Sequence, residues 1–392
     1  MAERDKAANA FPAPGAARES LNDDERLDWL RLIRSKNVGP TTFHELMQHF
    51  GTAAAALEAL PELMRSGGRS GPRSVVSRDE AEAEFAQAQR IGAQLVCLGE
   101  KGYPARLAAI DPPPPVLYVK GRLELADKPM VAIVGARNGS AVGQKFTRMI
   151  ASDLGQTGFV IASGLARGID TAAHKAALET GTLAVLAGGL CSFYPPENAE
   201  LQKTIGDIGL LVSERPPAFN PTGKDFPRRN RLISGVAAAT VIVEAAKRSG
   251  SLITARFAAE QGREVLAVPG HPLDPRAAGT NQLLQDGATL VSSADDVVAV
   301  LAPILGSGAT ASATQECVAG IEDRPSAPSP RLEGSARQLV IDALGVSPVD
   351  VDELIRTTEL PARDVQIILL ELDLAGRLER HGRQLVSLKG AS

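Results

Sequence analysis

Short apolar runs recur through the middle of the chain, and this rhythm restricts the fold more than any other feature. Six of them are Val131–Val134, Phe159–Ala162, Leu183–Leu186, Leu210–Val212, Thr240–Val243 and Val265–Val268. Segments long enough for a helix lie between most of these runs. Strands that are apolar on both faces and alternate with helices are typical of a parallel sheet covered on both sides. The pattern predicts an α/β domain over residues 90–302, to which the runs at 95–98 and 116–119 add a strand or two.

The segments on either side of this domain predict two smaller units. In the first, apolar residues at helical spacing are interrupted by the turn Asn37–Pro40, so we expect a small helical domain over residues 21–78. In the second, residues 335–390 predict three helices and a terminal hairpin, which is the element order of a winged helix. We expect a flexible tail at 1–20 and a linker at 303–334, where Gly, Ser, Ala and Pro prevail.

Charge and cysteine content exclude several classes of protein. The chain has 392 residues, enough for two or three folded units. Its net charge of −4 excludes a uniformly basic nucleic-acid coat, although a local basic patch stays open. The three cysteines are far apart and lack a CxxC pair, so we expect neither a disulfide framework nor a zinc site. No apolar run reaches the length of a membrane span, and we expect a soluble, cytoplasmic protein.

Turns rich in Gly, Ser and Arg follow three of the predicted strands, at residues 135–140, 163–170 and 249–254. Because the carboxyl ends of parallel strands lie along one edge of a sheet, these turns are expected to meet there. Each would place backbone N–H groups and a helix N-terminus where an anion can bind. A single such turn could equally serve tight packing of a strand against a helix. Three on one edge, two of them with arginine, favour anion binding.

These turns do not match the common nucleotide-binding motifs. Glycines at 135, 139 and 143 lack the G-x-G-x-x-G spacing, and Ser163-Gly164 stands where a ribose-binding carboxylate is expected. The chain also lacks the G-x-x-x-x-G-K-[ST] motif. The sequence therefore argues against a nicotinamide dehydrogenase and against ATP hydrolysis on a P-loop, and it predicts no cofactor.

The densest basic cluster lies in the segment 215–231, which holds five basic side chains and one acidic one. Its four prolines are expected to keep the segment out of a helix, with Phe226 exposed among guanidinium groups. Cations that follow phosphates and a ring that stacks on an unpaired base suit a single-stranded nucleic acid. The alternative is a solvated basic loop with Phe226 folded into the core.

Candidates for catalysis are few. Asp170 and His174 are four residues apart on an expected helix, a spacing that occurs more often in surface pairs than in catalytic ones. Glu244 ends a strand beside the glycine turns, where it could act as a base, cap Ser249 or pair with an arginine. The other histidines are too scattered to suggest a metal site. We therefore expect no catalytic residue and no metal ion.

The terminal units give weaker indications of nucleic-acid contact. Residues 334–392 carry seven basic and nine acidic side chains, and the helix that would enter a DNA groove is mainly apolar and acidic. Groove-reading helices need basic and amide side chains, so only the wing, with Arg377, Arg380 and Arg383, suits DNA. A protein contact is at least as plausible. The turn Asn37–Pro40 resembles a helix-hairpin-helix turn, which offers amides to a phosphate, but it is also an ordinary connector.

Several motifs of the central domain occur together in one protein family. They are Val134–Arg137, Ser163–Asp170 with Ala173-His174, Gly189-Leu190 with Tyr194–Asn198, Ser213-Glu214, Phe226–Arg231 with Ile233–Gly235, Glu244-Ala245, Ser249–Ala255, Val268–Gly270 and Gly279–Asn281. In this order, over about residues 95–292, they resemble the DprA/Smf family. One departure is Ala136, where serine is commoner in the family, so a hydroxyl donor is missing.

The resemblance implies a DNA-processing protein of natural transformation or recombination. Family members bind incoming single-stranded DNA, protect it from nucleases and help load the RecA recombinase. Their extended Rossmann-like domain uses no nucleotide cofactor and forms a homodimer. Carried over by motif, the DNA-binding candidates are Arg137, Ser163, Gly164, Arg167, Lys224, Phe226, Arg228, Arg229, Asn230, Arg231, Gly250 and Ser251. Arg137, Lys224 and Arg231 would hold phosphates, Phe226 would stack on a base, and the glycine turns would donate N–H groups.

Two other functions stay open on the residues alone. A nucleotide or nucleoside-phosphate hydrolase could use the same edge of the sheet, with Glu244 or Asp170 as the base. A protein-interaction scaffold would instead rely on the acidic winged helix.

Overall fold

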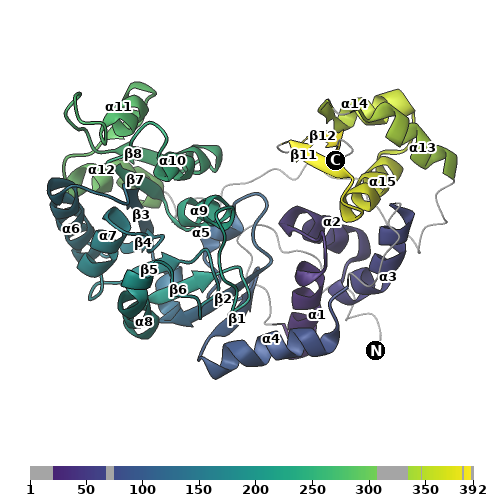
Figure 1. The fold of residues 1–392 in the computed structure, drawn as a ribbon, viewed down its shortest axis with the longest axis horizontal. Helices are drawn as coiled ribbons and strands as arrows, with labels where there is room; N and C mark the ends of the chain where they lie inside the picture. The colour runs from purple at the N-terminus through teal and green to yellow at the C-terminus, as the bar shows by residue number, and fades with distance from the viewer. Residues whose placement is uncertain (1–20, 68–74, 307–333, 346, 382–383, 390–392) are drawn as a thin grey trace. The chain divides into compact units, whose positions relative to one another are not determined.

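The computed structural model describes residues 21–67, 75–306, 334–345, 347–381 and 384–389. They form two compact units, seen in Figure 1. The α/β unit contains the described residues among 21–26 and 82–306, and the terminal unit contains those among 27–81 and 334–389. The expected tail at 1–20, most of the expected linker and the wing residue Arg383 lie outside the described residues.

The α/β unit is built on one sheet. Its strands are β1 (Gln94–Cys97), β2 (Val116–Gly121), β3 (Met130–Gly135), β4 (Val160–Ser163), β5 (Thr182–Val185), β6 (Leu210–Ser213), β7 (Ala239–Val243), β8 (Glu264–Ala267) and β9 (Thr289–Leu290). The spatial order is β1-β2-β6-β5-β4-β3-β7-β8-β9. From β6 to β9 neighbouring strands are parallel, whereas β2 pairs antiparallel with both β1 and β6. The expected α/β fold is confirmed, with a mixed sheet because no long crossover helix joins β1 to β2.

Helices cover both faces of this sheet (Figure 1). α6 (Ala141–Gln156), α7 (Ile169–Ala176) and α12 (Ala294–Gly306) share a hydrophobic core with β3, β4 and β7. α9 (Asp225–Val236) and α10 (Gly250–Glu260) pack against each other and on β3 and β7. The remaining elements are α5 (Ala105–Ala108), α8 (Ala199–Ile208), α11 (Ala278–Gln285) and the short helices η1 (Leu123–Asp127) and η2 (Pro196–Asn198). Strands buried on both faces are apolar throughout, which is why the sequence predicted them.

The winding of the sheet reverses between β3 and β7. β4, β5 and β6 follow one another on one side of β3, while β7 and β8 lie on the other. These two strands pair in parallel up to Gly135, which stands opposite Val243. In open α/β sheets, the crevice beyond the carboxyl ends of such a strand pair is where ligands bind. The turns that follow β3 and β7 therefore meet at the position of greatest functional interest.

The basic segment 215–231 is partly helical, so the expectation that its prolines exclude a helix is wrong. α9 begins at Asp225 and contains Phe226 through Arg231. Pro227 lies in the first turn, where the backbone N–H has no partner within the helix and the fixed φ of proline is tolerated. Because successive helical residues point about 100° apart, the arginines of α9 cannot all face one ligand.

The terminal unit combines N-terminal helices with a winged helix, and both expectations are confirmed. The helices of the N-terminal third are α1 (Asp23–Arg34), α2 (Pro40–Phe50), α3 (Ala53–Ser66) and α4 (Arg78–Arg90), of which α3 and α4 were not foreseen. The first residues of α1, up to Arg26, and most of α4, from Glu82 on, belong to the α/β unit. The winged helix consists of α13 (Gly334–Ala343), β10 (Val349–Asp350), α14 (Val351–Thr358), α15 (Ala362–Leu374), β11 (Leu378–His381) and β12 (Leu385–Leu388). Among the described residues, no helix has both the length and the apolar character needed to cross a membrane.

The third helix of the winged helix, α15, is buried on two faces. Its residues Val365, Ile368, Leu369 and Leu372 belong to the winged-helix core, and Ile367, Leu370 and Leu374 are buried as well. α15 packs on α2 and α3. Asn37 Nδ2 donates a hydrogen bond of 2.7 Å to the carbonyl of Leu374, and a Cβ at Gly67 would lie 2.1 Å from the carbonyl oxygen of Glu371. The helix that would enter a DNA groove is thus largely a packing surface within its own unit.

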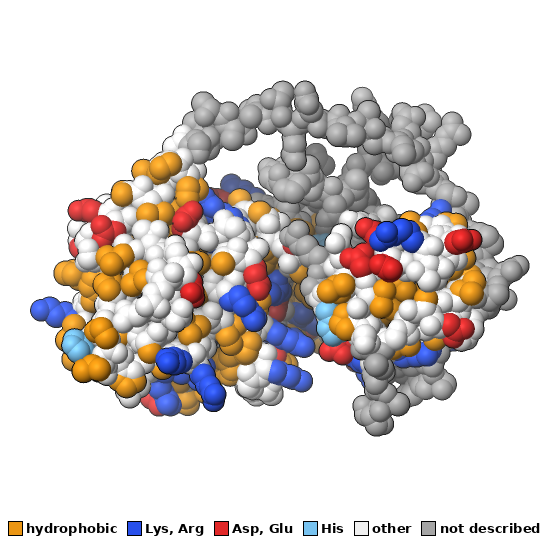
Figure 2. Space-filling view, turned by 90° about the horizontal axis from the view of Figure 1, so that it is seen from above, with side chains coloured by type: hydrophobic (Ala, Val, Ile, Leu, Met, Phe, Trp, Pro, Cys, Tyr) orange, Lys and Arg blue, Asp and Glu red, His pale blue; other side chains and the backbone are white. Residues whose placement is uncertain are grey.

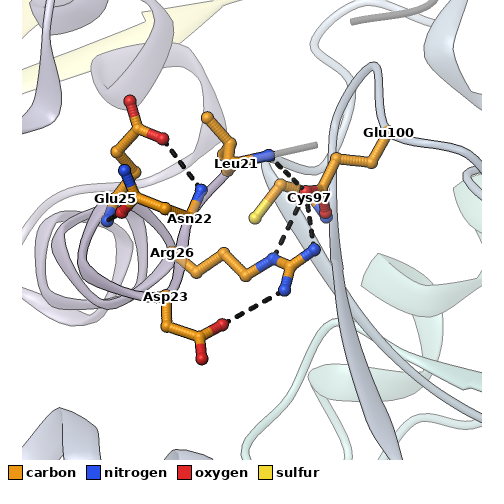
Figure 3. Close-up of polar contacts among 7 residues, drawn as sticks. All are labelled: Leu21, Asn22, Asp23, Glu25, Arg26, Cys97 and Glu100. Atoms are coloured by element: carbon orange, nitrogen blue, oxygen red, sulfur yellow. Dashed lines mark hydrogen bonds and ion pairs between the residues drawn. The ribbon is translucent and has the colours of Figure 1, made fainter. Parts of the chain in front are cut away.

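A buried carboxylate holds the first described residues on the α/β unit (Figure 3). Glu100 Oε1 accepts the N–H of Leu21 and the guanidinium of Arg26, each at 2.9 Å, and Oε2 accepts the N–H of Cys97 at 2.8 Å. A buried carboxylate is tolerated only when such donors compensate its charge. Glu100 therefore fixes where the chain enters this unit.

Candidate functional site

A cavity of about 830 Å³ opens at the edge of the sheet where β3 and β7 end. It is lined by the turn after β3, the first turns of α9 and the loop that leads from β7 into α10. Six of the twelve candidate residues line it: Arg137, Phe226, Arg229, Asn230, Gly250 and Ser251. Gly164 and Arg167 line a smaller adjoining pocket that shares Arg137 and Phe226. Three segments that are distant in the sequence therefore meet at the switch point of the sheet, the place between β3 and β7 where its winding reverses. Ligand sites in this architecture lie at such a point.

The ring of Phe226 belongs to a small cluster at the cavity. The Tyr194 ring lies 5.0 Å from it, between centroids, at an angle of 53°. The guanidinium carbon of Arg137 lies 5.5 Å from the centroid of the Phe226 ring, within cation–π distance. Tyr194 is 48% exposed, and Phe226 is partly buried. Phe226 lines the cavity instead of joining the core, which leaves an aromatic pair and an arginine together at the surface.

Several cations near the cavity are exposed and without acidic partners. Arg137 and Arg248 line the cavity, while Lys224 and Arg228 lie at the start of α9. Within the described residues, none of these four makes an ion pair with a carboxylate. Figure 2 shows Lys and Arg side chains gathered beside hydrophobic ones on one face of the α/β unit. Such uncompensated cations attract a polyanion and release its counterions on binding.

Arg229 has a different position from its neighbours in the basic segment. It is 6% exposed, and its Nη1 donates to the carbonyl of Gly164 at 2.7 Å and to that of Val185. Burial lowers the pKa of Arg229 to about 10, although the charge of Asp170 opposes this shift. A Cβ at Gly164 would lie 2.8 Å from the guanidinium carbon, so a larger residue there would require the Arg229 side chain to move. Arg229 therefore ties α9 to the ends of β4 and β5, and this use of its donors argues against a phosphate contact.

Three further candidates have protein partners. Arg231 donates to Glu214 at 2.6 Å and to the carbonyl of Pro112 at 3.0 Å, and it does not line the cavity. The buried hydroxyl of Ser163 donates to the carbonyl of Ile133 at 2.6 Å. These positions do not suit the phosphate contact expected of Arg231 or a DNA contact by Ser163. Arg167 pairs with Glu197 at 2.5 Å, but both side chains are 60% exposed, and such pairs are easily exchanged for another anion.

Two of the three glycine turns are closed by carboxylates of the chain itself. Asp170 Oδ2 accepts the N–H groups of Gly164 at 3.1 Å and Ala166 at 3.2 Å. Glu244 accepts the N–H and the hydroxyl of Ser140. The expectation that these turns offer free N–H donors to an external anion therefore fails at these amides. The third turn, which includes Gly250 at the start of α10, lines the cavity.

The polar groups considered for catalysis are occupied as well. His174 is fully buried, its Nδ1 lies 2.7 Å from Thr182 Oγ1, and burial lowers its pKa to about 3. Burial raises the pKa of Asp170, against the opposing charge of Arg229. Asp170 and Glu244, either of which was considered as the base of a hydrolase, both accept N–H groups of the chain. In the described segments, no three His, Cys, Asp or Glu side chains are grouped to hold a metal ion.

The cavity residues that were not proposed from the sequence as DNA contacts include Tyr194, Arg248 and Arg276. Arg248 directly precedes the Ser249 turn, and its charge beside a strand end was an available signal. Arg276 is held by Asp274 through two hydrogen bonds of 3.0 and 3.1 Å, which raises its pKa. Tyr194 reaches the cavity from the segment after β5, and nothing local in the sequence indicates that it does so.

Comparison with known proteins identifies relatives along the whole chain. Residues 94–302 match the family model of DNA recombination-mediator protein A, residues 23–87 the DprA-like N-terminal HHH domain, and residues 324–382 the DprA winged helix domain. The Smf protein of Synechocystis is 32% identical over 385 residues, covering 91% of this chain and 97% of the relative. DNA processing protein DprA of Streptococcus pneumoniae is 46% identical over 199 residues, which are 50% of this chain and 70% of that protein. The X-ray structure of the pneumococcal protein superposes with a TM-score of 0.63 at 34% identity, covering 72% of this chain and 98% of that one.

Proposed function

This chain belongs to the DprA/Smf family, and from that premise we propose that it binds single-stranded DNA and passes it to the RecA recombinase during transformation or recombination. Family models that are described as DprA domains or as DNA recombination-mediator protein A match its N-terminal, central and C-terminal parts. The relatives are named for DNA processing. We also propose that the functional divisions of the chain are 21–78, 90–302 and 335–390.

One observation carries the proposal: unpaired cations and aromatic rings meet at the switch point of the sheet. Arg137 lies within cation–π distance of Phe226, whose ring also contacts Tyr194. Rings at the surface of a basic cavity can stack on bases only where those bases are unpaired. A duplex hides the faces of its bases and would engage only the cations. The geometry therefore favours a single strand over a duplex.

The proposed contact residues are a revised version of the sequence list. Arg137, Lys224 and Arg228 would hold phosphates, together with Arg248, which was not on that list. Phe226 would stack on a base, and Asn230, Gly250 and Ser251 would form the wall of the groove. Arg167 would exchange Glu197 for a phosphate. The other four candidates would shape the site without contacting DNA, because protein groups already use their donors or the space around them. They are Arg229, Arg231, Ser163 and Gly164.

The test is a titration of the full-length protein with a fluorescent oligonucleotide, single-stranded and as a duplex of equal length, at several salt concentrations. We expect tighter binding of the single strand and a linear fall of log K with log salt, with a slope of about −0.7 for each phosphate contact. Equal affinity for the duplex, or binding that does not respond to salt, would overturn the proposal. Purified protein incubated with nucleoside monophosphates should release no base. Turnover that Glu244→Gln abolishes would establish the hydrolase instead.

Delivery to RecA and self-association are proposed from family membership alone. In a RecA filament assay on protein-coated single strands, we expect the chain to speed nucleation. Sedimentation of the protein alone should show a homodimer. A monomer that still accelerates RecA would separate these two properties.

A further inference from the structure

The side chain of Glu244 lies at the N-terminus of α6. Its Oε2 accepts the backbone N–H of Ser140 at 2.8 Å, and its Oε1 accepts the hydroxyl of the same residue. Ser140 is the N-cap of α6, and its hydroxyl oxygen accepts the N–H of Gly143 at 2.9 Å. A carboxylate from the end of β7 is thus bound at the positive end of a helix of sixteen residues.

This is the place where α/β sheets of this winding bind nucleotide phosphates. The helix that follows the first strand of the switch point points its N-terminus at the crevice, and a phosphate of the ligand normally sits there. Here that strand is β3 and that helix is α6. The carboxylate of Glu244 supplies the negative charge that a bound phosphate would bring.

Two local features hold Glu244 in this position. Its backbone has a φ of +54°, a left-handed conformation that a residue other than glycine adopts only when its surroundings impose it. Gly143, in the first turn of α6, leaves the space for its carboxylate, because a Cβ there would lie 2.6 Å from the carboxyl carbon and from Oε1. The backbone of β7 and the sequence of α6 are therefore both adapted to the same carboxylate.

We propose that Glu244 is a built-in substitute for a ligand phosphate, which closes the nucleotide site of the fold to phosphate and mononucleotides. The phosphates of a DNA strand would then bind to other cations of the cavity, Arg137 and Arg248 among them. This inference rests on the proposed function for its biological meaning. It specifies how a cavity at a nucleotide-binding position would select a polymer backbone over a single nucleotide.

The experiment asks whether removing the carboxylate opens a phosphate site. Inorganic phosphate and AMP are titrated by calorimetry into the wild type, Glu244→Gly and the matched control Glu244→Gln. Glycine suits the left-handed backbone and empties the site, whereas glutamine keeps an oxygen acceptor of the same length. We expect Glu244→Gly to bind phosphate at least about tenfold more tightly than the wild type, since a helix N-terminus favours an anion. Glu244→Gln should stay close to the wild type.

A second variant and a second measurement cover the case of a poorly folded Glu244→Gly. Glu244→Asn also tolerates a left-handed backbone but is one carbon too short to fill the site. In a double-mutant cycle, Gly143→Ala should destabilise the wild type more than the Glu244→Gly protein, because the three atoms nearest to the new Cβ all belong to the Glu244 carboxylate.

The inference would be overturned if folded Glu244→Gly or Glu244→Asn bound phosphate no more tightly than the wild type. It would also be overturned by strict additivity in the double-mutant cycle, or by a wild type that already binds phosphate through the Ser140 amide. Binding of oligonucleotides by the wild type is measured separately. Failure of that binding would overturn the proposed function without deciding whether Glu244 closes the phosphate site.

Discussion

The edge of the α/β sheet and the winged helix both carry arginines, and the two regions differ in what those arginines bind. At the cavity, Arg137 and Arg248 are exposed and make no ion pair with any described carboxylate. In the winged helix, Arg380 binds Glu45 at 2.8 Å and Asp373 at 3.1 Å. Arg337 likewise binds the buried Glu371 at 2.7 Å. Arg137 and Arg248 thus keep their positive charge available to a ligand, whereas the charges of Arg337 and Arg380 are compensated by carboxylates of their own unit.

From this difference we propose that the partners of a side chain, more than the motif in which it stands, decide whether it contacts nucleic acid. A cation gains from meeting a phosphate only if its charge is not already compensated nearby. Arg380 lies on a wing, a common DNA-binding element, yet it would have to leave two carboxylates to reach a phosphate. We therefore propose that DNA contacts the cavity and that the paired arginines of the winged helix have a structural role.

The largest effect on DNA binding is expected from removing two unpaired cations of the α/β unit. Replacing Arg137 and Lys224 together by alanine should weaken single-strand binding roughly a hundredfold, because a charge-assisted hydrogen bond is worth about 1.5 kcal/mol. The salt slope should become less steep by about 1.4, the value for two phosphate contacts. Both quantities come from fluorescence anisotropy at several salt concentrations.

A matched control in the winged helix makes the result specific. Arg363 is exposed at the start of α15, and Arg363→Ala removes a positive charge of the same kind. We expect its effect on affinity and slope to be small. If Arg363→Ala weakens binding as much as the double variant does, DNA contact is not confined to the cavity.

The aromatic cluster offers a test that does not involve charge. Phe226→Ala should weaken single-strand binding about thirtyfold, within the range of about 1–3 kcal/mol for a stacked base. The salt slope should be unchanged, because no phosphate contact is lost. Phe226→Leu keeps most of the volume without the ring and should recover little of the affinity. Full recovery by leucine would show that the residue only packs against Tyr194.

Acidification should separate the two units by stability. The pKa of His174 is lowered by burial to about 3, from 6.5, so the unfolded chain takes up a proton that the folded α/β unit excludes. The contribution of His174 is therefore complete above its unfolded pKa and is lost as the pH falls, about 1.4 kcal/mol by pH 5.5. In the terminal unit, burial raises the pKa of Glu45 and of Glu371, and such groups stabilise the fold as the pH falls.

Two probes follow the units independently in this experiment. The single tryptophan, Trp29, is buried in the terminal unit and reports its unfolding by fluorescence. Amide exchange in β4 and β5 reports the α/β unit. His174→Asn keeps a donor for Thr182 but cannot take up a proton, so it should remove most of the acid sensitivity of the α/β unit. An unchanged pH dependence in this variant would mean that other groups cause it.

The sequence predicted the strands of the sheet best where both faces of a strand are buried. The runs at 131–134 and 240–243 lie within β3 and β7, since central strands are apolar on both faces. The α9 helix was missed because Pro227 was taken as a helix breaker, although proline is tolerated in a first turn. Whether a proline breaks or begins a helix depends on the residues around it.

For the site, the sequence brought together residues that follow strand ends but could not assign their partners. Arg137 was expected at the carboxyl edge because its turn follows a strand, and the structure places it at the cavity together with Phe226. The burial of Arg229 depends on carbonyl groups at the ends of β4 and β5, more than forty residues away in the chain. Likewise, the pairing of Arg231 with Glu214 follows from how α9 packs, which local sequence does not specify.

The smallest effect is expected at Arg380, whose ion pairs with Glu45 and Asp373 lie within the terminal unit. Both partners are partly exposed, 24% for Arg380 and 34% for Glu45, so the pair should contribute only about 1 kcal/mol or less. Arg380→Glu places a third carboxylate beside Glu45 and Asp373 and should lower the urea midpoint of the Trp29 transition. Adding Glu45→Arg restores opposite charges and should recover at least part of that loss, which a role in DNA binding would not predict.

In parallel, Arg380→Ala should leave the salt slope of single-strand binding unchanged. A reduced slope would mean that phosphate competes successfully with two carboxylates, and pairing would then be no guide to which arginines contact DNA.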